Sequence, residues 1–87
     1  MKVRNVENER GKAVANQFII SSGTTVVFQS FASTICRIVR GKVYIDKNKW
    51  DYSSTTGKYR NQFLGEDKKT TQKKIDSGEY VLADLNN

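Results

Sequence analysis

Residues 17–46 read QFIISSGTTVVFQSFASTICRIVRGKVYID, and this stretch decides the fold class. It consists of runs rich in β-branched and aromatic residues, which are typical of strands. Ser22-Gly23 separates the first two runs and predicts a β-hairpin, and Arg40-Gly41-Lys42 predicts a tight turn before the last run. The expected strands cover residues 17–21, 24–31, 34–40 and 43–46.

The pattern becomes helical after Trp50. Tyr59, Phe63 and Leu64 recur at i, i+4 and i+5, which is the apolar stripe of a short helix. Gly65 is expected to end that helix, because glycine readily adopts the left-handed conformation found at helix C-termini.

A second short helix is expected over residues 70–76, with Asp67 or Thr70 as its N-cap. Ile75 is its single large apolar residue. Residues 79–85 then alternate between apolar and polar side chains and predict a last strand.

These elements predict an α+β fold: a small antiparallel sheet of four to five strands with two short helices, in the order ββββ-α-α-β. A chain of 87 residues is expected to form one domain. We place that domain at residues 16–87 and expect residues 1–15 to be a loosely ordered N-terminal segment.

The composition is basic, with 15 Lys and Arg against 9 Asp and Glu and a net charge of +6. Such a balance favours anionic partners, although it also serves solubility. The single cysteine cannot form an intramolecular disulfide, so we expect a cytoplasmic location. No apolar run is long enough for a signal peptide or a membrane span, so no membrane contact is expected.

Residues suited to catalysis are scarce. Histidine is absent, and Cys36 lies in an apolar strand without a histidine to activate it, so we expect it to be a buried packing residue. Asp46 with Asp51, and Glu66 with Asp67, lack a third metal ligand at a recognised spacing. We therefore predict that the protein is not an enzyme and has no catalytic residues, metal site or cofactor.

Binding is the remaining class of function. The candidate partner-binding residues are one aromatic and five cationic side chains near the two expected helices: Tyr52, Lys58, Arg60, Lys69, Lys73 and Lys74. Three interpretations stay open. They are contact with nucleic acid, through charge and ring stacking, contact with an acidic patch on a partner protein, and a homo-oligomer joined through a sheet edge. An ordinary structural reading places Trp50, Tyr59 and Phe63 in the core.

Several segments together resemble a family of short, uncharacterised proteins of bacteriophages and other mobile genetic elements. They span most of the chain from about residue 17: Phe28-Gln29-Ser30-Phe31, Trp50-Asp51-Tyr52-Ser53 with Thr55-Thr56, Lys58-Tyr59-Arg60 with Phe63-Leu64-Gly65, Lys74-Ile75 with Ser77-Gly78-Glu79-Tyr80, and Asp84-Leu85-Asn86.

The resemblance implies a genomic setting rather than a chemistry. It leads us to expect a non-enzymatic accessory protein that binds and inhibits host machinery, such as a defence nuclease or its ribonucleoprotein, in the manner of an anti-CRISPR protein. That step is an analogy. The alternative is a small basic nucleic-acid-binding protein.

Overall fold

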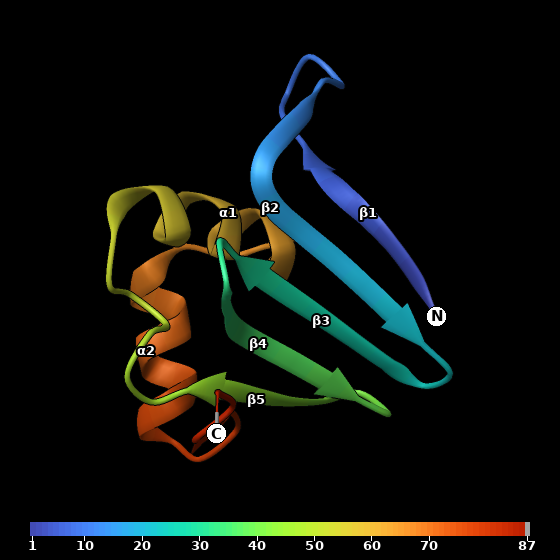
Figure 1. Cartoon of the computed structure of the whole chain (residues 1–87). Helices are drawn as coiled ribbons and strands as arrows, with labels where there is room; N and C mark the ends of the chain where they lie inside the picture. The colour runs from blue at the N-terminus through green and yellow to red at the C-terminus, as the bar shows by residue number, and fades with distance from the viewer. Residues whose placement is uncertain (87) are drawn as a thin grey trace.

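The computed structural model describes residues 1–86 and, within them, contains one sheet and two helices (Figure 1). Helices α1 (Ser54–Leu64) and α2 (Lys68–Asp76) both fall between the last two strands. The strands are β1 (Lys2–Glu7), β2 (Ala13–Ser22), β3 (Thr25–Ser30), β4 (Ser33–Val39), β5 (Lys42–Asp46) and β6 (Val81–Ala83).

The strands lie side by side in chain order, β1-β2-β3-β4-β5-β6. Neighbours from β1 to β5 are antiparallel, whereas β6 pairs with β5 in parallel. A parallel pair needs a long crossover connection, and α1 and α2 supply it. The α+β class and the order ββββ-α-α-β of the predicted elements are confirmed. The prediction of four to five antiparallel strands is wrong, because the described sheet is mixed and has six strands.

The additional strand is β1, which lies in the segment that we expected to be loosely ordered. Val6 is the one buried residue of β1 and is 2% exposed, while most of its other side chains face solvent. The Asn5 side chain also donates a hydrogen bond to the Val14 carbonyl at 2.8 Å. With one inward-facing apolar residue at the sheet edge, this segment gives almost no apolar alternation to detect in the sequence.

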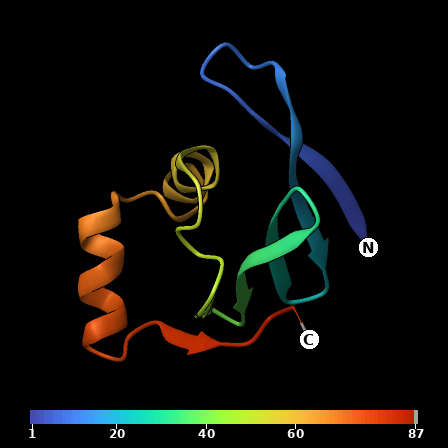
Figure 2. The same ribbon diagram turned by 60° about the vertical axis from the view of Figure 1, so that its left-hand side comes forward.

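The core lies between one face of the sheet and the helices, which stand together on that side (Figure 2). The strand register places Ile19, Phe28, Cys36 and Ile45 in one row across β2 to β5. Phe28 stacks on Phe63 of α1 with ring centroids 5.7 Å apart. Cys36 is fully buried, as expected.

Capping side chains define the two helices. The Ser53 hydroxyl accepts from the Thr56 amide at the start of α1, and Gly65 ends α1 with φ of 70°, which confirms the predicted stop. Asp67 accepts from the Thr70 amide at 2.8 Å and is therefore the N-cap of α2. For this reason α2 starts at Lys68 and not at residue 70. Neither helix has the length and apolar character needed to cross a membrane.

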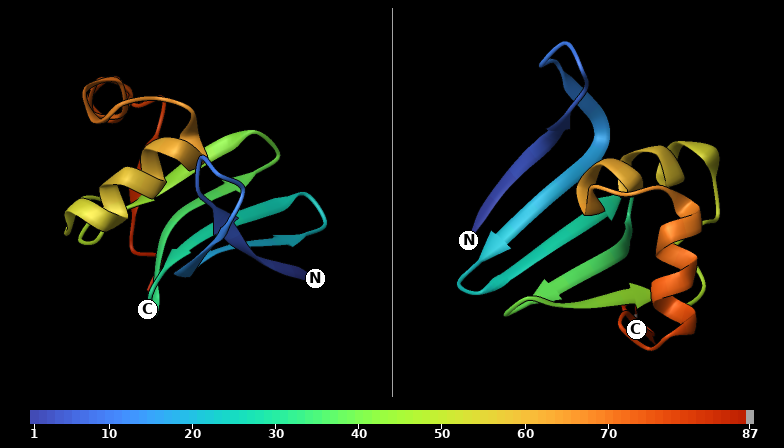
Figure 3. Two further views of the ribbon diagram at one scale, coloured as in Figure 1. Left: turned by 90° about the horizontal axis from the view of Figure 1, so that it is seen from above. Right: turned by 180° about the vertical axis from the view of Figure 1, so that it is seen from behind.

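The opposite side of the sheet carries no helix, as both views in Figure 3 show. We call it the uncovered face. Its central row crosses all the strands of the sheet and is named here the cross-strand row: Val3, Ile20, Val27, Arg37, Tyr44 and Val81.

Candidate functional site

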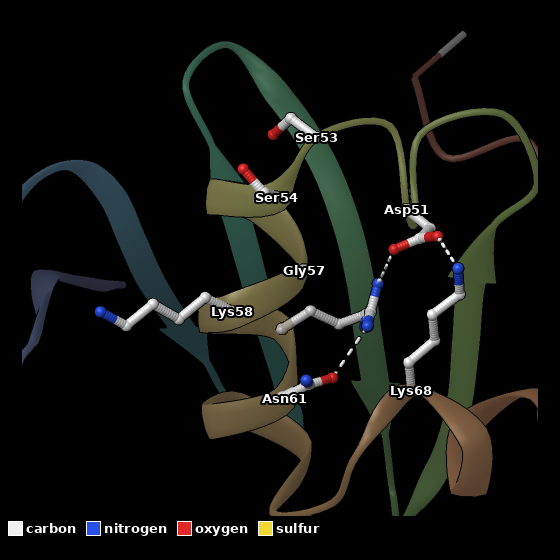
Figure 4. Close-up of a pocket in the computed structure, with 8 residues that line it drawn as sticks. Asp51, Ser53, Ser54, Gly57, Lys58, Asn61 and Lys68 are labelled. Carbon is white, nitrogen blue, oxygen red and sulfur yellow. Dashed lines mark hydrogen bonds and ion pairs between the residues drawn. The ribbon is translucent and has the colours of Figure 1, made fainter.

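A depression of about 430 Å³ opens beside the N-terminal half of α1 (Figure 4). Ser54, Gly57, Lys58 and Asn61 form one wall, because residues at i, i+3, i+4 and i+7 share one face of a helix. Ser53 and Arg60 also line the depression, and Asp51 and Lys68 close its other side. The depression therefore carries three cationic side chains and one carboxylate.

Arg60 is buried beneath this depression and is only 1% exposed. Its guanidinium donates to the Trp50 carbonyl at 2.6 Å, to Asp51 Oδ1 at 3.0 Å and to Asn61 Oδ1 at 2.8 Å. The same group lies 4.9 Å from the centre of the Trp50 ring. Arg60 therefore fixes the loop before α1 to the helix, and the structure places this predicted partner-binding residue inside the fold and not on an exposed surface.

Asp51 joins Arg60 to the start of α2. Its second carboxylate oxygen lies 2.5 Å from Lys68 Nζ. Burial by itself disfavours the charged carboxylate, but the hydrogen bonds and positive charges of Lys68 and Arg60 outweigh it and hold the pKa of Asp51 below its usual range. Asp51 is thus an ionised bridge between the two helical segments.

Glu66 forms a second internal cluster between the helices. Its carboxylate accepts from Thr71 Oγ1 at 2.6 Å, from Lys74 Nζ at 2.8 Å and from the Tyr80 hydroxyl at 2.8 Å. The Lys74 ammonium also lies 5.3 Å from the Tyr80 ring centre. Lys74 was predicted to contact a partner, but the structure places it in this internal cluster, where it connects α2 to the segment before β6.

The other predicted residues are exposed. Lys58 lies on α1, and Lys69 and Lys73 lie one turn apart on α2. None of the three has a carboxylate within ion-pair distance among residues 1–86. Tyr52 is 44% exposed in the loop before α1, with Lys49 Nζ 5.1 Å from its ring centre. We name Lys58, Lys69 and Lys73 the cationic helix surface. It has two separate parts, because Lys58 extends from α1 on the side away from α2 (Figure 4).

The arrangement of α2 makes this surface accessible. Thr71 is the one buried residue of the helix, so most of its circumference faces solvent, and Figure 2 shows it at the edge of the molecule. The exposed lysines of α2 are evident from the lysine-rich composition of this segment. Sequence reasoning missed Lys68 and Asn61 of the depression, whose roles depend on contacts with Asp51 and Arg60 that no local pattern encodes.

The described residues contain no group of three or more His, Cys, Asp or Glu side chains placed to share a metal ion. Burial raises the pKa of the Cys36 thiol to about 12, so a thiolate nucleophile is not formed near neutral pH. What the arrangement offers chemically is exposed positive charge on a rigid support.

No curated protein and no solved structure matches the chain. A family model described as "Family of unknown function (DUF8033)" matches residues 1–79. The expectation of an uncharacterised family is thereby confirmed, whereas an origin in bacteriophages or mobile elements stays a prediction. The match extends over most of the 87 residues, and the chain therefore belongs to the DUF8033 family of unknown function.

Proposed function

We propose that this protein acts without catalysis, by binding an acidic partner through the cationic helix surface. The proposal rests on the observation that two nearby carboxylates are already paired inside the fold. Asp51 and Glu66 are consumed by internal pairs with Arg60, Lys68 and Lys74. The lysines of the cationic helix surface have no carboxylate within ion-pair distance in the described part of the chain. Asp67 and Asp76, at the two ends of α2, offset part of the charge of Lys69 and Lys73, and the remainder is available to another molecule.

The preferred partner is a host protein with an acidic patch. This choice rests on the resemblance to small phage and mobile-element proteins, which by analogy implies inhibition of host machinery such as a defence nuclease. Complementary charge raises the rate of association and selects among partners more than it adds affinity. The cytoplasm of the host is the matching location.

Nucleic acid is the second candidate partner, and Tyr52 favours it. Its ring is 44% exposed in the loop that leads to α1. Proteins that hold single strands combine cationic side chains along the phosphate backbone with rings on which bases stack. Lys49 Nζ lies 5.1 Å from the centre of this ring, so an exposed ring and a cation occur together at one point of the surface.

The test is a pull-down from host lysate with the full chain and with a triple variant, Lys58→Gln, Lys69→Gln and Lys73→Gln. We expect the wild type to enrich a defined host protein in a salt-sensitive manner and the variant to lose it. A control variant, Lys2→Gln, Arg10→Gln and Lys12→Gln, removes the same charge from exposed positions in and after β1 and should retain the protein. Equal loss in both variants would contradict the proposal.

Labelled single- and double-stranded oligonucleotides decide between the two partners. Phosphate contacts predict an affinity that falls steeply between about 50 mM and 200 mM salt. If oligonucleotide binding depends on Tyr52 and on the same lysines, nucleic acid becomes the assigned partner. Absence of binding at low salt would leave the protein partner as the proposed one.

A further inference from the structure

The uncovered face of the sheet has the composition of an interface. Its cross-strand row contains five apolar or aromatic residues and one cation, Arg37. Two shorter rows flank it: Asn5, Phe18, Gln29 and Thr34 on one side, and Ser22, Thr25, Val39 and Lys42 on the other. None of these residues is acidic. Asp46 lies on the same side of β5, but it is 1% exposed and accepts hydrogen bonds from three backbone amides. An apolar centre containing Tyr and Arg, with a polar rim, is typical of protein-binding surfaces.

The side chains of the cross-strand row are partly exposed, as expected for a sheet face without a covering helix. Ile20, Val27 and Tyr44 are fully flanked by neighbouring strands yet remain partly exposed, because no helix covers them. On the other face, Phe28 and Ile45 are completely buried, whereas Val26, Ile38 and Val43, farther along the same strands, are partly exposed. Exposed apolar groups in a contiguous row mark interaction sites on small soluble proteins.

Charge indicates what the partner carries. Arg37 is directly opposite Tyr44 in the register, and Lys42 Nζ lies 5.6 Å from the Tyr44 ring centre. Arg40 lies in the turn between these two strands. The positive charge is therefore concentrated at the β4–β5 end of the row, whereas the β1–β3 part is apolar.

Two other occupants fit the face less well. A second copy of the chain would bring Arg37, Arg40 and Lys42 of both copies to one interface, where like charges repel. Nucleic acid would need rings placed against successive bases. Phe18 and Tyr44 lie three strand spacings apart, about 14 Å, and the aliphatic side chains between them offer no stacking surface.

We infer that the uncovered face docks an acidic amphipathic segment of a partner protein, with its apolar side chains on the cross-strand row and a carboxylate against Arg37. This contact uses no residue of the cationic helix surface. Failure of this inference therefore does not affect the proposed function, and failure of the proposed function does not affect this inference.

The probe is a synthetic amphipathic helix of about 16 residues, with leucine at i, i+3, i+4 and i+7 and glutamate elsewhere. Its length of about 24 Å matches five strand spacings of about 4.8 Å across the sheet. The probe is titrated into the isotope-labelled full chain and followed by NMR. We expect saturable shifts at Ile20, Val27, Arg37 and Tyr44, and a loss of affinity of about tenfold or more in Arg37→Glu.

Matched variants distinguish a specific effect at the uncovered face from a general effect of net charge. Lys12→Glu makes the same charge change at an exposed position in the turn after β1 and should retain binding within about twofold, as rim charges usually do. Lys42→Glu provides a second test on the face if Arg37→Glu does not fold. The triple glutamine variant of the cationic helix surface should bind the peptide like the wild type.

Several results would overturn the inference. They are absence of saturable shifts, shifts centred on α1 or α2, or equal binding of a peptide with lysine in place of glutamate. Oligo(dT) that shifts the same face residues at least as strongly would assign the face to nucleic acid. A dimer in light scattering, with shifts of these residues that depend on protein concentration, would assign it to a second copy.

Discussion

Arg60 and Asp51 form a charged pair in which one partner is buried and the other faces the depression. The guanidinium, 1% exposed, lies 3.0 Å from the carboxylate, whose side chain is 30% exposed. Arg60 is also held by Trp50 and Asn61. It is therefore a structural cation at the centre of the helical layer.

Replacing Arg60 with alanine is expected to destabilise the fold by about 3 kcal/mol, because it leaves a cavity and removes the donor that satisfies the Trp50 carbonyl and the Asn61 side chain. Chemical denaturation measures the change. Lys68→Ala removes the other cation on Asp51, but Lys68 is 59% exposed, so the expected cost is at most about 1 kcal/mol. Equal costs for the two variants would show that the Arg60 cluster does not hold the helices.

Glu66 is expected to make stability depend on acid. Burial disfavours its charged form, but hydrogen bonds from Lys74, Thr71 and Tyr80 outweigh burial and lower the pKa of Glu66 in the folded state. Its contribution is therefore complete above its usual pKa of about 4.3 and is lost as the pH falls through the folded value.

Urea denaturation of the wild type and Glu66→Gln at pH 7 and pH 3 tests this effect. We expect the gap in unfolding free energy between the two proteins to be large at pH 7 and smaller at pH 3. Glu9→Gln, which alters an exposed carboxylate in the turn after β1, should show little gap at either pH. A gap for Glu66→Gln that is unchanged by acid would refute the assigned role.

Cys36 is expected to resist thiol reagents in the native protein. It is fully buried, and burial raises its pKa to about 12, while only the thiolate reacts readily. Iodoacetamide at pH 8 should modify the unfolded chain in denaturant and leave the folded chain unmodified, as mass spectrometry would record. Rapid labelling of the folded protein would mean that β4 opens to solvent.

β1 is expected to be an integral part of the fold. Val6→Ala removes a side chain that is 2% exposed, and two lost methyl groups correspond to about 1–2 kcal/mol. Val3→Ala, at a residue that is 57% exposed, should change stability by less than about 0.5 kcal/mol. Thermal denaturation of both variants measures the loss of stability. An equally small loss in the two variants would show that β1 contributes little to the stability of the fold.

The local elements of the fold could be predicted from the sequence. β-branched runs separated by Ser22-Gly23 and Gly41 identified β2 to β5, the apolar spacing of Tyr59 and Phe63 identified α1, and Gly65 marked its end. These features depend on residues close together in the chain, so hydrophobic periodicity and turn residues predict them. The exposed lysines of α2 were visible for the same reason.

The remaining features follow from packing between segments that are distant in the chain. The tertiary structure paired β1 with β2, placed β6 parallel to β5 and buried Arg60 among groups up to ten residues away in sequence. It also left the cross-strand row uncovered by placing both helices on the other face. Each of these outcomes depends on which surfaces come into contact in the folded chain. The alternation of side chains along a strand defines its two faces, but it does not show which face the helices will cover.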